Sequence, residues 1–315
     1  MTRLQKTLLA LGVAVGGIAL ATTPPRLNYM PEVRLDPDLP SLLQDSEGGL
    51  IPGTEKRLTW HDGEQATQWS VVALHGFSAS RQETAPLAEI VADSIGANLF
   101  ETRFAGHGLK ENGLSDVTAE EWLDDVADAL TVGQLIGDKL VVIATSNGAA
   151  LTMAMLEHPA MQTVDAVVML SPNFAPADSK AKWLTRPGGP LLLRLIMGPT
   201  RSWKALNDRQ ELYWTTSYPS ETTIQVMRVV NRANKTLRES RAPRVQVVYS
   251  PNDIVISLAA LQSAYAAIQS PLKEIFEVAE TGSPFNHIIV GDIISPNNTI
   301  PVAAKITEFI LRQNL

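Results

Sequence analysis

The sequence predicts an α/β fold, in which a mainly parallel β-sheet carries helices on both faces and an inserted helical cap. Short apolar runs rich in β-branched residues alternate with amphipathic helical segments, as in sheets whose strands are joined by crossover helices. The alternation is interrupted between residues 172 and 243, where large aromatic residues are frequent. With 315 residues, 45% of them hydrophobic and 19% charged, the chain can bury one large core.

The expected elements follow one another in a regular order. They are strands at residues 55–60 and 68–74, a helix at 81–96, a strand at 97–102, a helix from 119 to about 137, a strand at 139–144, a helix at 147–157, strands at 166–170 and 245–249, a helix at 258–268, a strand at 274–278 and a closing helix at 300–315. The clearest boundary is a capping box, in which Thr118 precedes a helix and Glu121 occupies its third position.

The first 21 residues have the pattern of a secretory signal peptide. Arg3 and Lys6 form a positive region, residues 8–21 are apolar and uncharged, and Ala19-Leu20-Ala21 offers a cleavage site of small residues. The apolar stretch is shorter than the roughly 20 residues that cross a bilayer. We therefore expect a periplasmic or secreted protein. The alternative is an uncleaved membrane anchor through residues 4–23, with the folded part outside the cytoplasm.

The remaining chain divides into three parts. Residues 22–53, rich in Pro, Asp and Leu, form an N-terminal arm, and residues 54–171 together with 244–315 form the core. Residues 172–243 form the cap, which should lie over the carboxyl edge of the sheet, where ligands bind in α/β folds. Its large aromatic residues either line a ligand pocket or form the cap's own small core; they are Trp183, Trp203, Tyr213, Trp214 and Tyr218.

Charge and composition exclude several classes of function. The net charge is −7 and no run of Lys or Arg is present, so nucleic acid is not an expected partner. The chain has no cysteine, which excludes disulfides, thiolate metal sites and a cysteine nucleophile. The oligomeric state is left open by the sequence.

Ser146 lies where a buried strand turns sharply into a helix. The run Ala144-Thr145-Ser146-Asn147-Gly148 has small residues two positions before and after the serine, where strand and helix backbones approach each other closely. This is the form of a nucleophile elbow, which holds a serine hydroxyl clear of the sheet. The helix that follows directs its positive end at the site. We therefore expect an exposed hydroxyl; the alternative is a serine in an ordinary strand–helix loop.

A serine hydroxyl becomes a nucleophile only when a base accepts its proton and an acid orients that base. Asp253 follows the expected strand at 245–249, and His287 ends the loop after the last strand, so the chain order is Ser, Asp, His. Asp292 is a second candidate acid, but it follows His287 by five residues and is expected on a helix pointing away.

The chain has only five histidines, so each can be weighed separately. His61 lies in an early turn and His158 precedes a proline at the end of a helix, and both are expected at the surface. His75 and His107 lie in loops where a histidine commonly bonds the backbone. His287 is therefore the expected base.

Stabilising an oxyanion requires two N–H donors close to the nucleophile. Asn147 follows the serine directly and supplies one of them. The loop after the first core strand, His75-Gly76-Phe77, supplies the other through Phe77, whose ring is expected to line an acyl pocket.

With these motifs the sequence resembles the α/β-hydrolase superfamily, and within it the branch of bacterial carboxylesterases, monoacylglycerol lipases and lysophospholipase-like enzymes. The resemblance rests on His75-Gly76-Phe77, residues 103–108, residues 144–148, Asn252-Asp253 and Asn286-His287. It implies that Ser146 is the nucleophile, Asp253 the acid, His287 the base, and Phe77 and Asn147 the oxyanion donors. It implies no metal and no organic cofactor. Ala144 departs from the more usual glycine, and Phe104-Ala105 stands where proline is common.

The sequence and this resemblance together predict an exported serine hydrolase that cleaves acyl or lipid-like esters through an acyl-enzyme. An acyltransferase or a serine peptidase or amidase on the same three residues is an alternative. A catalytically silent hydrolase fold that serves as a binding module is an alternative from another class. The expected partner is a small-molecule or lipid ester, with peripheral or N-terminal membrane association as a further expectation.

Overall fold

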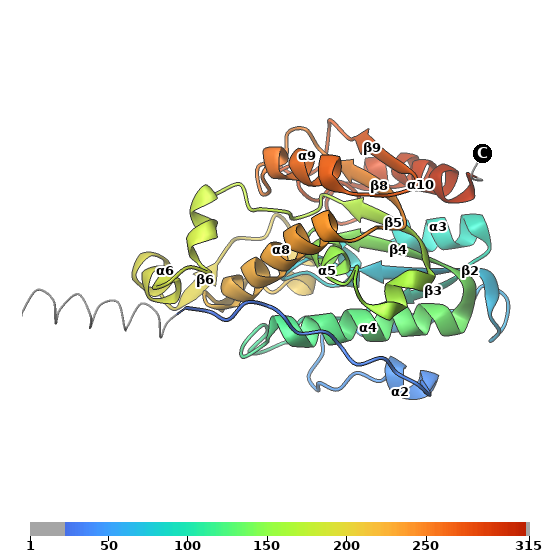
Figure 1. The fold of residues 1–315 in the computed structure, drawn as a ribbon, viewed down its shortest axis with the longest axis horizontal. Helices are drawn as coiled ribbons and strands as arrows, with labels where there is room; N and C mark the ends of the chain where they lie inside the picture. Colours follow the sequence, from blue (N-terminus) through green and yellow to red (C-terminus); the bar gives the residue numbers. More distant parts are fainter. Residues whose placement is uncertain (1–22, 313–315) are drawn as a thin grey trace, which may run out of the picture.

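A computed structural model describes residues 23–312 of the chain (Figure 1). The predicted signal peptide, residues 1–21, and most of the alternative anchor lie outside the described residues. Between Thr23 and Arg312, no helix is both long and apolar enough to cross a membrane.

The centre of the molecule is a sheet of seven strands in the order β1-β3-β2-β4-β5-β8-β9. All neighbouring strands are parallel except β1, which pairs antiparallel with β3 at one edge. The strands are β1 (Arg57–Thr59), β2 (Thr67–Leu74), β3 (Asn98–Glu101), β4 (Gly137–Thr145), β5 (Val164–Leu170), β8 (Arg244–Tyr249) and β9 (Lys273–Glu277). The predicted fold class, a mainly parallel α/β sheet, is confirmed.

Helices cover both faces of the sheet because the central strands bury side chains on both sides. On one face, Val72 and Val142 pack in a core with α4 (Ala119–Ile136), α5 (Asn147–Ala154), α8 (Thr222–Glu239) and α9 (Leu258–Ala267). On the other face, Val71 and Val141 pack against α3 (Leu87–Ile95) and α10 (Pro296–Leu311). Figure 1 shows α4 along one side of the sheet and α3 and α10 along the other.

Most predicted elements occur within a few residues of their expected bounds. The capping box is present, since the Thr118 side chain accepts the Glu121 N–H and the Glu121 side chain accepts the Thr118 N–H. The helix expected at 81–96 is instead a short 3₁₀ turn, η1 (Arg81–Glu83), followed by α3, which begins after Pro86. A proline lacks an N–H and disfavours helical backbone in the residue before it, so one continuous helix cannot form.

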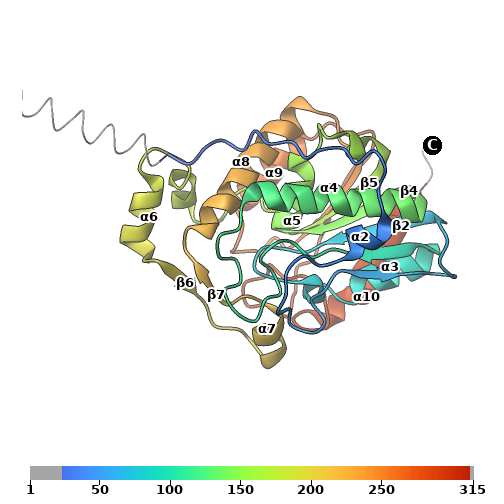
Figure 2. The same cartoon turned by 90° about the horizontal axis from the view of Figure 1, so that it is seen from below.

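Between β5 and β8 the chain forms the segment predicted as the cap. It contains η3 (Ser179–Trp183), α6 (Gly189–Met197), α7 (Asp208–Tyr213), α8 and the two-stranded sheet of β6 (Thr200–Ser202) and β7 (Ser217–Pro219). Figures 1 and 2 place α6 and β6 at the end of the molecule opposite the C-terminus. The helix α8 differs from the others, because its buried side chains pack in the same core as α4 and α5. The predicted range 172–243 thus includes one helix that covers the sheet.

The segment before β1 lies along the helical layer as an extended arm with one short helix, α2 (Leu39–Leu43). Arg228 on α8 donates from Nε to the Pro25 carbonyl at 2.9 Å. Arg34 donates to both carboxylate oxygens of Asp128 on α4, at 2.5 and 2.8 Å. The arm is therefore held to α4 and α8 by specific contacts.

Candidate active site

Ser146 lies between β4 and α5 with φ 49°, a conformation that L side chains rarely adopt. The turn needs a small residue after the serine, since a Cβ on Gly148 would lie 2.6 Å from the His75 carbonyl oxygen and 2.7 Å from that of Leu74. Ala144, the other small residue of the motif, is fully buried. In the sheet, Ala144 pairs with Leu74 of β2 on one side and with Met169 of β5 on the other. The strained turn is thus imposed by tight backbone packing on both sides.

Three side chains from the carboxyl edge of the sheet form one hydrogen-bonded chain. His287 Nε2 lies 2.9 Å from Ser146 Oγ, and His287 Nδ1 lies 2.7 Å from Asp253 Oδ2. A carboxylate can only accept, so Nδ1 carries the proton and Nε2 faces the hydroxyl with its lone pair. In this arrangement the imidazole can take the proton of Ser146 while the carboxylate stabilises the resulting cation.

The Asp253 carboxylate is fixed in position by the backbone that follows it. Its second oxygen, Oδ1, accepts the N–H groups of Val255 at 2.8 Å and Ile256 at 3.2 Å, and its side chain is completely buried. Asp292, the alternative acid, is exposed and lies in a turn, so its expected helical position is wrong. Its backbone N–H bonds the Ala85 carbonyl at 2.9 Å instead. The carboxylate that reaches the His287 ring belongs to Asp253.

Two backbone contacts hold the His287 loop against its neighbours. The Ile254 N–H donates to the Phe285 carbonyl at 3.1 Å, which joins the Asp253 turn to the His287 loop. Ser171 Oγ, at the end of β5, donates to the His287 carbonyl at 2.8 Å. These contacts set the imidazole between the acid and the hydroxyl.

The loop after β2 packs directly on the serine. A Cβ on Gly76 would lie 3.0 Å from both carboxylate oxygens of Glu83 and 3.3 Å from Ser146 Cβ, so a side chain at residue 76 would crowd both groups. The Phe77 N–H bonds no other group within residues 23–312. Asn147 is the first residue of α5, where an N–H has no partner in its own helix. Both predicted donors therefore have free N–H groups on segments adjoining Ser146.

His75 and His107 interlock the loops around the site. Each accepts a backbone N–H at Nε2, His75 from Phe104 at 3.2 Å and His107 from Ser78 at 3.1 Å. Burial lowers the pKa of His107 to about 4 and that of His75 well below its usual value, so both rings are neutral acceptors. Their expected structural role agrees with these bonds. His158 was expected at the surface, and this is wrong, because it is only 2% exposed and accepts the Ala160 N–H.

Glu83 is a site residue that the sequence pattern did not identify. It is 3% exposed, and its Oε2 accepts the Gly76 N–H at 2.7 Å. Burial raises the pKa of this carboxyl group to about 7, although the Gly76 N–H and the nearby His287 act to lower it. In the sequence Glu83 looks like a polar residue of an amphipathic helix, so only its position behind the Gly76 loop reveals it.

Residues of the cap cover the site. The Tyr218 ring meets the Phe77 ring edge to face at 5.1 Å. Trp214 is buried in a cluster with Ala79 and with Ile293 and Ile294, and the Thr215 N–H donates to the Ser78 carbonyl at 2.7 Å. Ser146 itself is only 8% exposed, which corrects the expectation of an exposed hydroxyl. Trp183 differs from the other cap aromatics, since it is 54% exposed.

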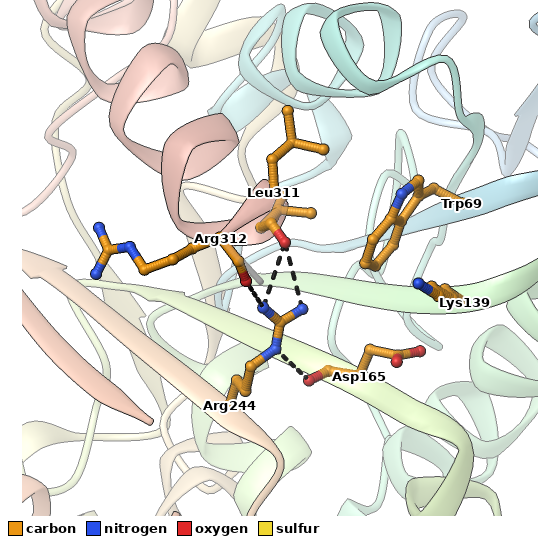
Figure 3. Close-up of a pocket in the computed structure, with 7 residues that line it drawn as sticks. Trp69, Lys139, Asp165, Arg244, Leu311 and Arg312 are labelled. Carbon is orange, nitrogen blue, oxygen red and sulfur yellow. Dashed lines mark hydrogen bonds between the residues drawn. The ribbon is translucent and has the colours of Figure 1, made fainter. Parts of the chain in front are cut away.

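A cavity of about 280 Å³ lies at the opposite, amino edge of the sheet (Figure 3). Trp69, Lys139, Asp165 and Arg244, near the amino ends of four strands, line it. The Arg244 guanidinium donates to the backbone carbonyls of Asp165, Ile310 and Arg312, as the dashed lines in Figure 3 show. This edge lacks the serine and its partners. Across residues 23–312, no three His, Cys, Asp or Glu side chains cluster in a way that could hold a metal ion.

Comparison with known proteins agrees with this geometry. The profile of the Hydrolase_4 family, described as serine aminopeptidase, S33, matches residues 65–282. No curated protein matches the sequence. Several solved structures share the fold at low identity, so they establish the fold alone.

Three of these structures illustrate the likeness. A metagenome-derived lipolytic enzyme of the LipS and LipT pair has a TM-score of 0.66 at 18% identity, over 83% of this chain and 98% of that one. Monoglyceride lipase from Saccharomyces cerevisiae has a TM-score of 0.63 at 12% identity, over 92% and 98%. Monoacylglycerol lipase from Paleococcus ferrophilus has a TM-score of 0.58 at 16% identity, over 81% and 97%.

The matched profile spans more than half of the chain, and it includes the elbow serine and the Asp253 turn. The seven-stranded sheet and its solved neighbours have the same architecture. The chain therefore belongs to the α/β-hydrolase family described as serine aminopeptidase, S33, and it shares its fold with solved lipolytic enzymes and monoacylglycerol lipases.

Proposed function

We propose that the protein is a serine hydrolase that cleaves carboxylic esters with acyl or lipid-like groups through an acyl-enzyme on Ser146. The observation that carries this proposal is the hydrogen-bonded chain from Asp253 through His287 to Ser146, at 2.7 and 2.9 Å. An intact chain of acid, base and hydroxyl argues against a silent binding module, because a module that only binds has no need of it.

The reaction follows from the positions of these groups. His287 Nε2 accepts the hydroxyl proton as Ser146 Oγ attacks the ester carbonyl, and Asp253 stabilises the imidazolium that forms. The Phe77 and Asn147 N–H groups bind the oxyanion. His287 then protonates the leaving alcohol, which departs. Water, deprotonated by the same imidazole, attacks the acyl-enzyme and releases the acid together with free Ser146.

A lipid-like acyl group is favoured by the apolar walls around Ser146. The Phe77 and Tyr218 rings are in contact beside the oxyanion loop, and Trp214 lies between this loop and the segment that follows His287. The names of the similar structures include lipolytic enzymes and monoacylglycerol lipases, which supports the same substrate class.

A second candidate activity is peptide or amide hydrolysis, favoured by the description of the matched family as serine aminopeptidase. Both activities use the same acyl-enzyme and differ in the leaving group. An acyltransferase would use it too, with an alcohol in place of water.

The test is a panel of aryl esters of increasing acyl length, run beside an aryl amide, an aminoacyl anilide and a phospholipid. We expect ester hydrolysis to exceed amide hydrolysis by at least about a hundredfold, and a fluorophosphonate probe to label the protein. Faster cleavage of the aminoacyl anilide would favour the peptidase. Transfer of the acyl group to added glycerol in preference to water would favour the acyltransferase. A lack of both labelling and turnover would contradict the enzyme reading.

Export from the cytoplasm is a separate proposal and is supported by the sequence of residues 1–21. N-terminal sequencing of protein from cell fractions tests it, with Thr22 expected at the start of the mature chain. Intact Met1 in the soluble cytoplasm would contradict export, and intact chain in the membrane fraction would favour the anchor.

A further inference from the structure

The helix α6 in the cap turns its apolar side chains toward solvent. Of its six large apolar residues only Leu193 is buried, and Leu195 and Ile196 are 75% and 71% exposed. At 100° per residue, Leu191, Leu192, Leu195 and Ile196 lie on one side of the helix. A surface helix normally turns such a stripe toward the core, and a contiguous exposed apolar patch marks an interaction site.

The chain around α6 is strongly basic, although the protein as a whole is acidic. Residues 178–204 contain six Lys or Arg and one Asp, a net charge of +5, whereas the whole chain has a net charge of −7. All six cations are exposed. Arg194 pairs with Glu221 at 2.6 Å, and the other five form no ion pair with any residue of the described chain; they are Lys180, Lys182, Arg186, Arg201 and Lys204.

The combination of side chains points to one kind of partner. Aliphatic residues, an exposed tryptophan (Trp183) and unpaired cations on a short helical segment are the features of segments that lie in the interface of an anionic bilayer. There the aliphatic groups enter the acyl boundary, while the cations remain at the phosphate level. The core of a protein–protein interface is instead depleted of lysine.

The position of α6 in the molecule agrees with this partner. In both Figure 1 and Figure 2 the blue end of the coloured ribbon lies beside the cap and close to α6. The apolar stretch of residues 8–21 directly precedes this point in the sequence. A chain that retains this stretch as an anchor would therefore enter the membrane at the end of the molecule where α6 lies.

We propose that the protein binds the surface of an anionic lipid bilayer through the α6 face, defined as Trp183, Leu191, Leu192, Leu195 and Ile196 with the surrounding cations of residues 180–204. The inference is independent of the ester-hydrolase proposal, because it rests on exposure and charge and not on Ser146.

The test uses the full chain and vesicles of phosphatidylcholine, with or without one quarter phosphatidylglycerol. Binding is measured by co-sedimentation at low salt. We expect the anionic vesicles to bind at least about tenfold more tightly than the neutral ones. The double variant Leu195→Ser with Ile196→Ser should weaken this binding at least about tenfold, since two aliphatic groups are lost from the interface. Lys180→Gln and Lys182→Gln should each weaken it by about fivefold.

Ile300→Ser is the matched control, because Ile300 is 64% exposed on α10, outside residues 178–204, and this variant should bind like the wild type. A cooperative thermal unfolding transition close to that of the wild type reports that each variant is folded. Brominated lipids should quench part of the tryptophan fluorescence of the wild type, and this quenching should be absent in Trp183→Phe. Because the quenched residue is Trp183, the result separates contact through the α6 face from any contribution of residues 1–22.

Equal binding to both vesicle types, or binding that all the cap variants leave unchanged, would overturn the proposal. A concentration-dependent dimer that Leu195→Ser with Ile196→Ser dissociates, without vesicle binding, would assign the α6 face to a second copy of the chain and would also overturn it. Loss of esterase activity in Ser146→Ala with vesicle binding intact would show that the two proposals are separate.

Discussion

The two edges of the same sheet carry polar side chains in very different arrangements. At the carboxyl edge, the His287 ring is hydrogen-bonded to Asp253 on one side and to Ser146 on the other. At the amino edge, Arg244 ends on backbone carbonyls, and the Lys139 ammonium lies over the Trp69 ring at 4.9 Å. The amino edge also contains the cavity of about 280 Å³. A cavity by itself therefore does not identify the reactive site here, whereas the hydrogen-bonded acid, base and hydroxyl do.

The difference has a physical cause. The loops that follow parallel strands all lie at the same edge of the sheet, so residues that are distant in sequence come together there. The helix α5 also begins at this edge and presents its free N–H groups to Ser146. At the amino edge the same strands begin, and Arg244 there bonds the carbonyls at the end of α10.

The largest effect is expected from removing the nucleophile. Ser146→Ala should lower ester hydrolysis by at least about a thousandfold, because no acyl-enzyme can form. The melting temperature should stay close to that of the wild type. Ser94→Ala, which removes a hydroxyl bonded to the Ile90 carbonyl on α3, is the matched control and should keep full activity. If Ser146→Ala retained more than a trace of activity, the assignment of the active site to the carboxyl edge would be wrong.

The next effect concerns the base and the acid. His287→Ala should lose activity about as completely as Ser146→Ala, and the double variant should lose little more, because the three residues act as a unit. Asp253→Asn should lower kcat by roughly a hundredfold to ten-thousandfold. An amide can donate its N–H to Nδ1 of His287, which places the imidazole proton on Nε2, where it cannot accept the Ser146 proton. Asp292→Asn is the control. A greater loss from Asp292→Asn than from Asp253→Asn would reverse the assignment of the acid.

A smaller effect is expected from Glu83, which supports the oxyanion loop from behind. Glu83→Ala should lower kcat by about tenfold with little change in KM, because the Gly76 N–H loses its acceptor at 2.7 Å. Glu83→Gln keeps an acceptor oxygen and should retain more activity. Equal activity of Glu83→Ala and the wild type would limit this carboxyl group to a packing role.

Glu83 should also make stability depend on pH. Its pKa in the folded protein, about 7, lies above the ordinary value of 4.5, so the folded protein holds this proton more tightly than the unfolded chain. The stabilisation is complete below pH 4.5 and is lost as the pH rises to 7. Urea unfolding at pH 4.5 and 7.5 should show a larger decrease for the wild type than for Glu83→Gln, by at most about 3 kcal/mol. A parallel decrease in both proteins would contradict this.

The cap aromatics should change substrate preference more than they change the chemistry. Each CH₂ of the acyl group that is buried contributes about 0.8 kcal/mol, so activity should rise with acyl length until the pocket is full. Trp214→Ala should change this profile more than the rate on acetate esters, because Trp214 packs beside the loops that flank Ser146. Trp203→Ala and Tyr213→Ala, whose side chains pack against the same cluster, extend the test. The exposed Trp183 is the control, and Trp183→Ala should leave the profile unchanged. A profile unchanged in all three inner variants would place the acyl pocket elsewhere.

The smallest effect should come from the amino edge. Lys139→Ala should leave kcat/KM within about twofold of the wild type, because this side chain contacts Trp69 and no group near Ser146. Steady-state kinetics on the preferred aryl ester measure this. A loss as large as that of Glu83→Ala would show that both edges influence the reaction.

Local patterns in the sequence carried enough information to predict the fold class. Alternating strand and helix periods require a parallel sheet, and the capping box of Thr118 and Glu121 marks a helix start through bonds within one turn. The motif predicts that residue 148 must be small. The structure gives the reason, because a Cβ on Gly148 would collide with the carbonyl oxygens of Leu74 and His75. Ser146 and His287 were also identifiable, because their motifs are short and the chain has few histidines.

The tertiary structure decided what depends on contacts between distant segments. Asp253 and Asp292 are similar in sequence terms, and only the Asp253 carboxylate reaches the imidazole. The burial of Glu83 and His158 and the packing of α8 on the sheet arise from segments that no local period describes. The exposed face of α6 is the clearest case, since an apolar stripe is the same in the sequence whether it faces a core or solvent. Which of the two it faces is set by the rest of the chain, because hydrophobic burial depends on the surface that is present to receive it.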